Sequence, residues 1–209
     1  MNIKHDTLTV NIHLLTFKTQ LELASTFLRF QEHYESPYFR GKFFSLEEFK
    51  DWYTRTSPKG IKTGKFTYYS DWAGFNIPSN TLQPFYEGRF DPLSDQEQQL
   101  LDLFSAERGA FYIIGIHSET KYTEQLLQHE IAHALFYTND DYRAEVLQII
   151  SKYDTEDIRE ELRIGYHEES LTDEVHAYSI DSERNLESHI PAKMSTELRK
   201  VFRKYLESS

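Results

Sequence analysis

AFYIIGIHSETKYTEQLLQHEIAHALFY, residues 110–137, contains the strongest strand pattern of the chain and its most informative helix. The first part, residues 110–116, is an almost continuous apolar run rich in isoleucine and aromatic residues, which predicts a strand. The second part has no glycine or proline from Gln125 to Tyr137, and its apolar residues recur at helical spacing. The sequence therefore predicts a strand that is followed closely by a largely buried helix.

That helix carries His129-Glu130-Ile131-Ala132-His133, an HExxH motif. Residues i and i+4 of a helix lie one turn apart on the same face, so both imidazoles can reach one Zn²⁺ at about 2.0–2.1 Å. Glu130 is then placed to act on a metal-bound water instead of on the metal, as the general base of a zinc peptidase does. The motif predicts His129 and His133 as metal ligands and Glu130 as a catalytic residue.

A catalytic zinc site keeps three protein ligands and one open position. The extended metzincin motif is excluded, because Phe136 and Asn139 occupy its glycine and last histidine positions. The third ligand is then expected on a downstream helix, and the first candidate is Glu174, which lies 41 residues (174 − 133) after His133. The alternatives are other carboxylates and histidines of the same region: Glu156, Glu160, Glu161, His167 and His176.

Together the two segments resemble the glutamate-zincin (gluzincin) metallopeptidases, in which an HExxH helix meets a later helix that carries a glutamate. A small residue often follows that glutamate three positions on, and Ala177 matches this pattern. The resemblance covers only about ten residues in two patches and identifies no more specific family. It implies Zn²⁺ as the cofactor, with His129, His133 and Glu174 as its ligands and Glu130 as the base.

Further roles are expected near the third ligand. Asp173 or Asp181 can accept the outer N–H of a ligand histidine and so fix its tautomer, although ordinary capping or solvation is the favoured explanation for each residue taken singly. Four residues that flank Glu174 can donate a hydrogen bond to an oxyanion, or simply pack: Tyr166, His167, His176 and Tyr178. Among them, His176 and Tyr178 are the predicted catalytic residues.

Composition narrows the class of protein. The chain has 209 residues, a net charge of −11 and 15% aromatic residues, which predicts one folded domain and argues against a nucleic-acid partner. The absence of cysteine excludes disulfides and thiolate ligands. Residues 1–6 lack a signal-peptide pattern, and no apolar run reaches membrane-spanning length. We therefore expect a cytoplasmic protein that acts on a peptide or protein without a membrane partner; export without an N-terminal signal stays open, and oligomeric state cannot be read from the sequence.

The order of elements predicts an α+β fold, zincin-like, with a small mixed or antiparallel sheet followed by a mostly helical C-terminal half. We expect a single domain over residues 1–209, with the sheet in about 1–117 and the helices in about 120–206. The expected strands are 7–17, 110–116 and a pair from 62–69 and 72–77. The expected helices are 21–34, 45–53, 94–104, 139–153, 155–164, 170–181 and 195–206.

Two segments have alternative interpretations. The strand at 111–116 is either an edge strand that pairs with an extended substrate or a central core strand. The segment 71–78 is either a cleft wall or part of a buried hairpin.

The predicted function is zinc-dependent hydrolysis of peptide bonds. One alternative is a hydrolase that cuts a non-peptide amide at the same metal site. A second is an inactive binding or regulatory protein with the same fold, and a third is a protein without metal, in which His129 and His133 are ordinary core or surface residues.

Overall fold

The apolar run after Ala110 forms strand β4 (Tyr112–His117), and the HExxH sequence lies on the helix that follows, α6 (Thr123–Thr138). The computed structural model describes residues 3–9, 11–119, 123–163, 166–181 and 189–207. Among these residues the remaining strands are β1 (Lys4–Thr9), β2 (Ile12–Phe17) and β3 (Gly74–Pro78). The remaining helices are α1 (Gln20–Glu35), α2 (Leu46–Thr56), α3 (Pro58–Thr63), α4 (Gln83–Tyr86), α5 (Asp95–Phe104), α7 (Asp140–Ile150), α8 (Glu156–Leu162), α9 (Leu171–Ile180) and α10 (Ala192–Glu207), with short 3₁₀ turns at Tyr68–Ser70, Ser79–Leu82 and Glu168–Ser170.

The four strands form one mixed sheet in the order β1-β2-β4-β3. β2 pairs with β4 in parallel, whereas β1 pairs with β2 and β3 pairs with β4 in antiparallel fashion. Every residue of β4 is buried, which explains its nearly continuous apolar sequence. β4 is therefore a central core strand, and the interpretation of this segment as a substrate-binding edge strand is wrong, because β3 occupies that edge.

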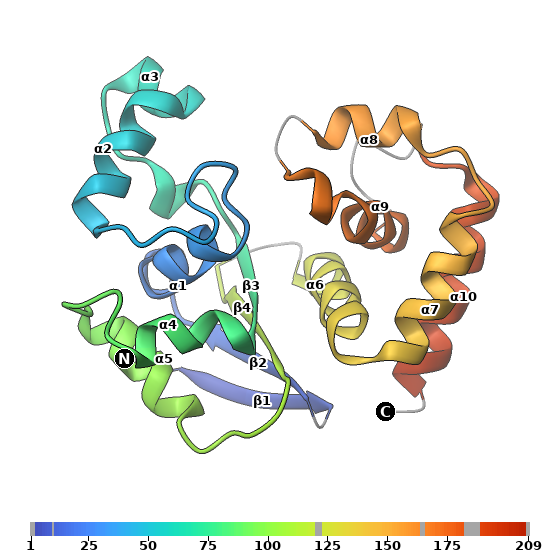
Figure 1. Ribbon diagram of the computed structural model, residues 1–209, viewed down its shortest axis with the longest axis horizontal. Helices are drawn as coiled ribbons and strands as arrows, with labels where there is room; N and C mark the ends of the chain where they lie inside the picture. The colour runs from blue at the N-terminus through green and yellow to red at the C-terminus, as the bar shows by residue number, and fades with distance from the viewer. Residues whose placement is uncertain (1–2, 10, 120–122, 164–165, 182–188, 208–209) are drawn as a thin grey trace.

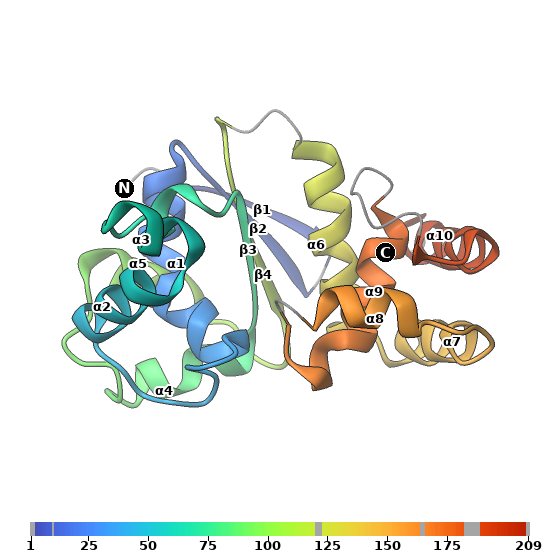
Figure 2. The same cartoon turned by 90° about the horizontal axis from the view of Figure 1, so that it is seen from above.

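Helices cover both faces of the sheet, as Figures 1 and 2 show. Ile12 and Ile114 face one core, which they form with α6, α7, α9 and α10. Leu15 and Ile113 face the other core, which they form with α1, α2 and α5. Successive strand residues thus point to opposite cores, and the protein is an α+β fold with a small four-stranded sheet between two helical layers.

Helix α1 lies unusually close to the central strand. A Cβ atom added at Gly115 would lie 2.7 Å from a methyl group of Leu23 and 2.7 Å from the ring of Phe27. Glycine at this position therefore allows the helix to rest on the strand backbone. This contact sets the position of α1, whose last turn carries Glu32 and Glu35 toward the functional site described below.

Several helices begin where the sequence predicts, because their N-terminal capping residues can be recognised from the sequence. Ser94 and Glu97 form the expected reciprocal capping box of α5, and Ser45 accepts the expected hydrogen bond at the start of α2. Asn139 caps α7 as expected. Helix α8 ends at Leu162, and the predicted stop at Gly165 lies outside the described residues.

Two strand predictions are wrong. The segment 7–17 is not one strand but parts of β1 and β2, which pair as a hairpin, and Asn11 lies in a turn between them. Alternation of apolar residues does not by itself separate one long strand from two short ones. The segment 62–69 contains no strand, because Ser57 caps α3, Pro58 is its first residue and Gly64 ends it at φ 64°. β3 consequently pairs with β4.

The predicted cap of the last helix is also wrong. α10 begins at Ala192, and Ser195 lies inside it, where its hydroxyl donates to the carbonyl of Ser179 on α9 at 2.7 Å. Ser170 precedes α9 as expected, but its side chain makes no capping hydrogen bond. None of the helices in the described ranges combines the length and the apolar character that crossing a membrane requires.

Candidate metal centre

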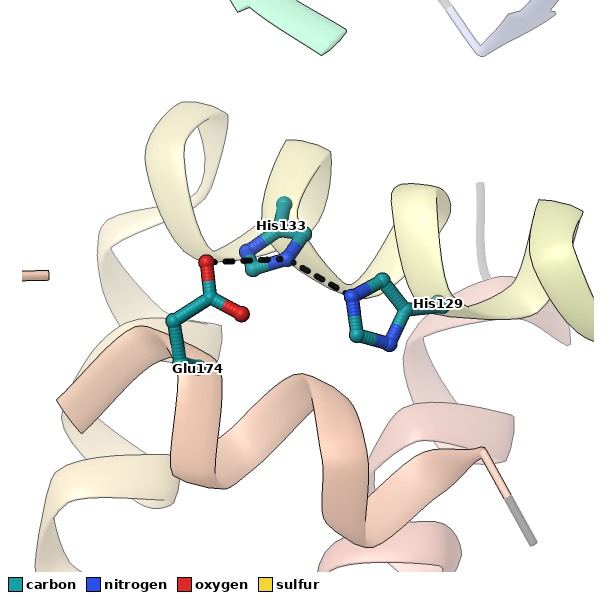
Figure 3. Close-up of side chains that lie close together, drawn as sticks. All are labelled: His129, His133 and Glu174. Atoms are coloured by element: carbon teal, nitrogen blue, oxygen red, sulfur yellow. Dashed lines mark hydrogen bonds and ion pairs between the residues drawn. The ribbon is translucent and has the colours of Figure 1, made fainter. Parts of the chain in front are cut away.

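Helices α6 and α9 pack against each other and bring Glu174 to two histidines that lie 41 and 45 positions earlier in the chain. His129 and His133 project from α6, and Glu174 projects from α9 toward them (Figure 3). Their nearest donor atoms all lie within 4.8 Å of one another. Each of the three residues is 4% exposed. The structure therefore groups the two HExxH histidines with the first candidate for the third ligand.

The two histidine nitrogens have the spacing of ligands of one metal ion, and the Glu174 carboxylate lies slightly farther away. Two zinc ligands at about 2.0–2.1 Å with tetrahedral angles lie roughly 3.3–3.4 Å apart. The Nε2 atoms of His129 and His133 are 3.2 Å apart, and Oε1 of Glu174 is 3.8 Å from Nε2 of His133. The other oxygen of Glu174 is buried and has no hydrogen-bond partner among the described residues. A buried carboxylate oxygen without a partner is costly, and a cation would satisfy it.

The charges around the three ligands also call for a cation. Burial alone lowers the pKa of His133, but the carboxylates of Asp173 and Glu174 outweigh it and hold that pKa well above its usual range. Burial raises the pKa of Glu174 well above its usual range, although His133 opposes the shift. Acidic side chains are thus crowded around His133 in a buried place. A divalent ion would replace the protons that these groups otherwise hold.

Asp173 sets the tautomer of His133. Its Oδ2 atom lies 2.8 Å from Nδ1 of His133, so this nitrogen donates and Nε2 is the nitrogen that would bind a metal. The pKa of Asp173 is lowered, because the two histidines His133 and His176 outweigh its burial, which raises it. Of the two aspartates proposed from the sequence, Asp173 makes this contact, whereas Asp181 occupies the C-cap of α9.

We expect Asp173→Ala to weaken zinc binding about 10–100-fold, because the ligand histidine loses the acceptor that fixes its tautomer. Competitive titration with a zinc-chelating dye measures this change. Asp157→Ala, at an exposed position on α8, is the matched control and is expected to bind zinc like the wild type. Equal zinc affinity in the Asp173 variant and the wild type would contradict the role of Asp173.

Glu130 is not one of the three grouped side chains, and it contacts Asn76 of β3. The side-chain amide of Asn76 donates to Oε2 of Glu130 at 2.5 Å, and Glu130 is 6% exposed. Glu130 also lines the cleft described next. Its placement, next to His129 and outside the ligand group, is compatible with the predicted role of a general base for water.

A cleft of about 500 Å³ opens beside the ligands, between α1, β3 and α6. Its lining includes the two ligand histidines and Glu174, and its walls are rich in aromatic side chains: Trp52, Tyr53, Tyr68, Trp72 and Phe75. No lysine or arginine lines it within the described part of the chain. Burial raises the pKa of both Glu32 and Glu35 to about 7. The cleft has the size of a ligand site and an acidic, aromatic character.

A second cavity of about 210 Å³ meets the site from the other side. Four residues line both cavities: Glu35, Asn76, His133 and Glu174. Arg40 and Arg143 also line the second cavity, whereas no lysine or arginine among the described residues lines the cleft, so the two spaces differ in charge. Both arginines already have acidic neighbours, since Arg40 pairs with Glu169 and Arg143 pairs with Asp140. The ligand group thus lies where two spaces of different charge meet.

His176 and Tyr178, expected to be catalytic, do not line either cavity in the described structure. His176 is fully buried, and its Nε2 atom lies 2.6 Å from the hydroxyl of Tyr142. Tyr178 packs edge-on against the His129 ring and lies 3.0 Å, hydroxyl to hydroxyl, from Tyr166. Tyr166 itself lines the cleft. His176 and Tyr178 therefore lie outside both cavities, and of the contacting pair Tyr166 and Tyr178 only Tyr166 lines the cleft.

The other candidates for third ligand lie elsewhere. Glu160 and Glu161 are exposed on α8, and Glu156 on the same helix is exposed and pairs with Arg163. His167 is exposed and caps the following turn. The described structure brings none of the four into the ligand group.

Sequence reasoning missed Asn76, Glu32 and Glu35 as residues of the site. No motif marks them, because they come from α1 and β3 and reach the site only through the packing of the sheet. The segment 71–76 lines the cleft, so its interpretation as part of a buried hairpin is wrong. An asparagine between the apolar residues Phe75 and Ile77 of a strand was the available signal.

Comparison of the chain with protein-family models, with curated proteins and with solved structures found no match. The interpretation of the site therefore depends on its own geometry and chemistry.

Proposed function

We propose that this protein is a zinc-dependent peptidase of the glutamate-zincin type, with His129, His133 and Glu174 as metal ligands. The observation that carries the proposal is the convergence of these three buried side chains beside a cleft that Glu130 also lines. When bound, Zn²⁺ supplies Lewis acidity toward a substrate carbonyl and toward water. The remaining chemistry is assigned to the chain's own side chains.

Glu130 is the proposed general base. A carboxylate at this position can take a proton from the attacking water and pass it to the amine that leaves when the peptide bond breaks. The hydroxyl of Tyr166 is the proposed donor to the oxyanion that develops on the carbonyl, because Tyr166 lines the cleft and its hydroxyl is held by that of Tyr178 at 3.0 Å. Burial raises the pKa of Tyr166, so this hydroxyl keeps its proton.

β3 is the proposed site of main-chain pairing with the substrate. It is an edge strand of the sheet, and Gly74, Phe75 and Asn76 line the cleft. An extended peptide can add to such an edge through backbone groups other than the Asn76 N–H, which already donates to Gln31, with little dependence on its sequence. This geometry favours a peptide over a small non-peptide amide as the substrate.

The test combines metal analysis with a cleavage assay. We expect the purified protein to contain one zinc per chain and to cleave members of a mixed peptide library. Removal of zinc with a chelator should abolish cleavage, and addition of one equivalent should restore it. Bound zinc without cleavage of any peptide would contradict the peptidase and favour a binding protein or a hydrolase of another amide. Absence of stoichiometric zinc would contradict the metal centre itself.

A further inference from the structure

We propose that Asn76 is a positioning residue that holds the Glu130 carboxylate in place, and that Tyr112 fixes the orientation of Asn76. The inference rests on the proposed function, because the position of Glu130 matters for turnover only if Glu130 is the base. It concerns β3 and β4, which carry neither a metal ligand nor the base.

Three contacts hold Asn76. Its amide nitrogen donates to Oε2 of Glu130 at 2.5 Å, and its amide oxygen accepts a hydrogen bond from the hydroxyl of Tyr112. Its backbone N–H donates to Oε1 of Gln31 at 3.2 Å. Helix α1, strand β4 and helix α6 thus meet at one asparagine, which the pairing of β3 with β4 also keeps in register opposite Ile114.

Asparagine suits this position because its side chain accepts one hydrogen bond, from Tyr112, and donates another, to Glu130. Tyr112 is 1% exposed, and burial raises the pKa of its hydroxyl well above the usual range, so it keeps its proton and donates. The oxygen of the Asn76 amide accepts this proton, and the amide nitrogen must then face Glu130. An ionised carboxylate offers acceptors alone, so the donor end of the amide matches a base that is ready to take a proton.

The consequence is a fixed base. A glutamate side chain has three rotatable bonds, and a catalytic carboxylate that turns out of reach of water contributes nothing. The hydrogen bond from Asn76 limits that rotation. Asn76 thereby connects the substrate-pairing edge of the sheet to the general base.

The experiment compares Asn76→Ala, Asn76→Asp and Tyr112→Phe with Asn80→Ala, an exposed control just after β3. We expect Asn76→Ala to lower kcat about 10–100-fold, with KM changed less than about threefold and zinc content unchanged. Asn76→Asp should lose at least as much, since it sets a carboxylate against a carboxylate. Peptide binding is followed separately by tryptophan fluorescence, because both tryptophans of the chain, Trp52 and Trp72, line the cleft.

Non-additivity tests the role of Tyr112. Tyr112→Phe should lower kcat several-fold in the wild-type background and have little further effect after Asn76→Ala, because it acts through the amide. If the effects of Tyr112→Phe and Asn76→Ala on kcat were fully additive, Tyr112 would not act through Asn76, and its proposed role would be contradicted. A kcat within about threefold of wild type for Asn76→Ala, or normal activity of Asn76→Asp, would overturn the proposal.

A measurement without turnover separates this inference from the proposed function. We expect Asn76→Ala to lower Tm by about 2–4 °C in the wild type and by clearly less in a Glu130→Ala background, because the hydrogen bond is then already lost. Equal Tm shifts in both backgrounds would overturn the contact. Coupled Tm shifts in a wild type that cleaves no peptide would refute the peptidase, and with it the positioning role of Asn76.

Discussion

Glu130→Gln is expected to lower kcat/KM for peptide cleavage by about 10²–10⁴-fold, the range over which general acid–base catalysis contributes. The amide has nearly the same shape as the carboxylate, and its oxygen can still accept from Asn76. It cannot accept a proton from water at neutral pH. The loss is therefore expected in kcat, with peptide binding and zinc content unchanged. Steady-state kinetics, zinc analysis and tryptophan fluorescence measure these three quantities.

Glu124→Gln is the matched control for this prediction. It makes the same change on the same helix, at an exposed position near the start of α6, and should retain wild-type kinetics. A Glu130→Gln variant that keeps more than about a tenth of the wild-type kcat/KM would contradict the assignment of Glu130 as the base. A variant that also loses zinc would show that Glu130 supports the metal centre instead.

Glu174→Ala is expected to weaken zinc binding by more than the roughly 10–100-fold typical of residues that only support a ligand. The substitution removes one of the three donors and leaves His129 and His133 as the remaining pair. Because Glu174 is buried with a raised pKa and an unsatisfied oxygen, its removal should not unfold the metal-free protein. Circular dichroism and Tm establish that the variant is folded before zinc affinity is measured.

Glu160→Ala and Glu161→Ala are the controls, since both carboxylates are exposed on α8 and lie outside the ligand group. Both variants should bind zinc with wild-type affinity. If either of them loses zinc while Glu174→Ala retains it, the third ligand must be reassigned to α8.

Local signals in the sequence were sufficient for much of the fold. The capping box at Ser94 and the cap at Asn139 placed the starts of α5 and α7, because a cap depends on residues within one turn. The order of strands and helices gave the α+β class correctly. The segment 7–17 failed because register and hairpin formation depend on the partner strand, which alternation of apolar residues does not specify.

The candidate ligands could be predicted to a similar extent. His129 and His133 were predicted from their spacing on one helix. Glu174 was predicted from its distance along the chain and from the resemblance of its neighbouring residues to a known pattern. Asn76 could not be found in this way, because its contact with Glu130 joins residues 54 positions apart. The positions of His176 and Tyr178 outside the two cavities likewise depend on how α9 is rotated about its axis, which the spacing of residues in the sequence does not determine.

X-ray absorption at the zinc edge of the purified, zinc-loaded protein tests the metal centre most directly. We predict one zinc per chain, with two imidazole nitrogens at about 2.0–2.1 Å and the rest of the first shell made of oxygen. In the His133→Ala variant the signature of two imidazoles should disappear. A shell of oxygen alone, a signal unchanged by that substitution, or zinc well below one per chain would contradict the account.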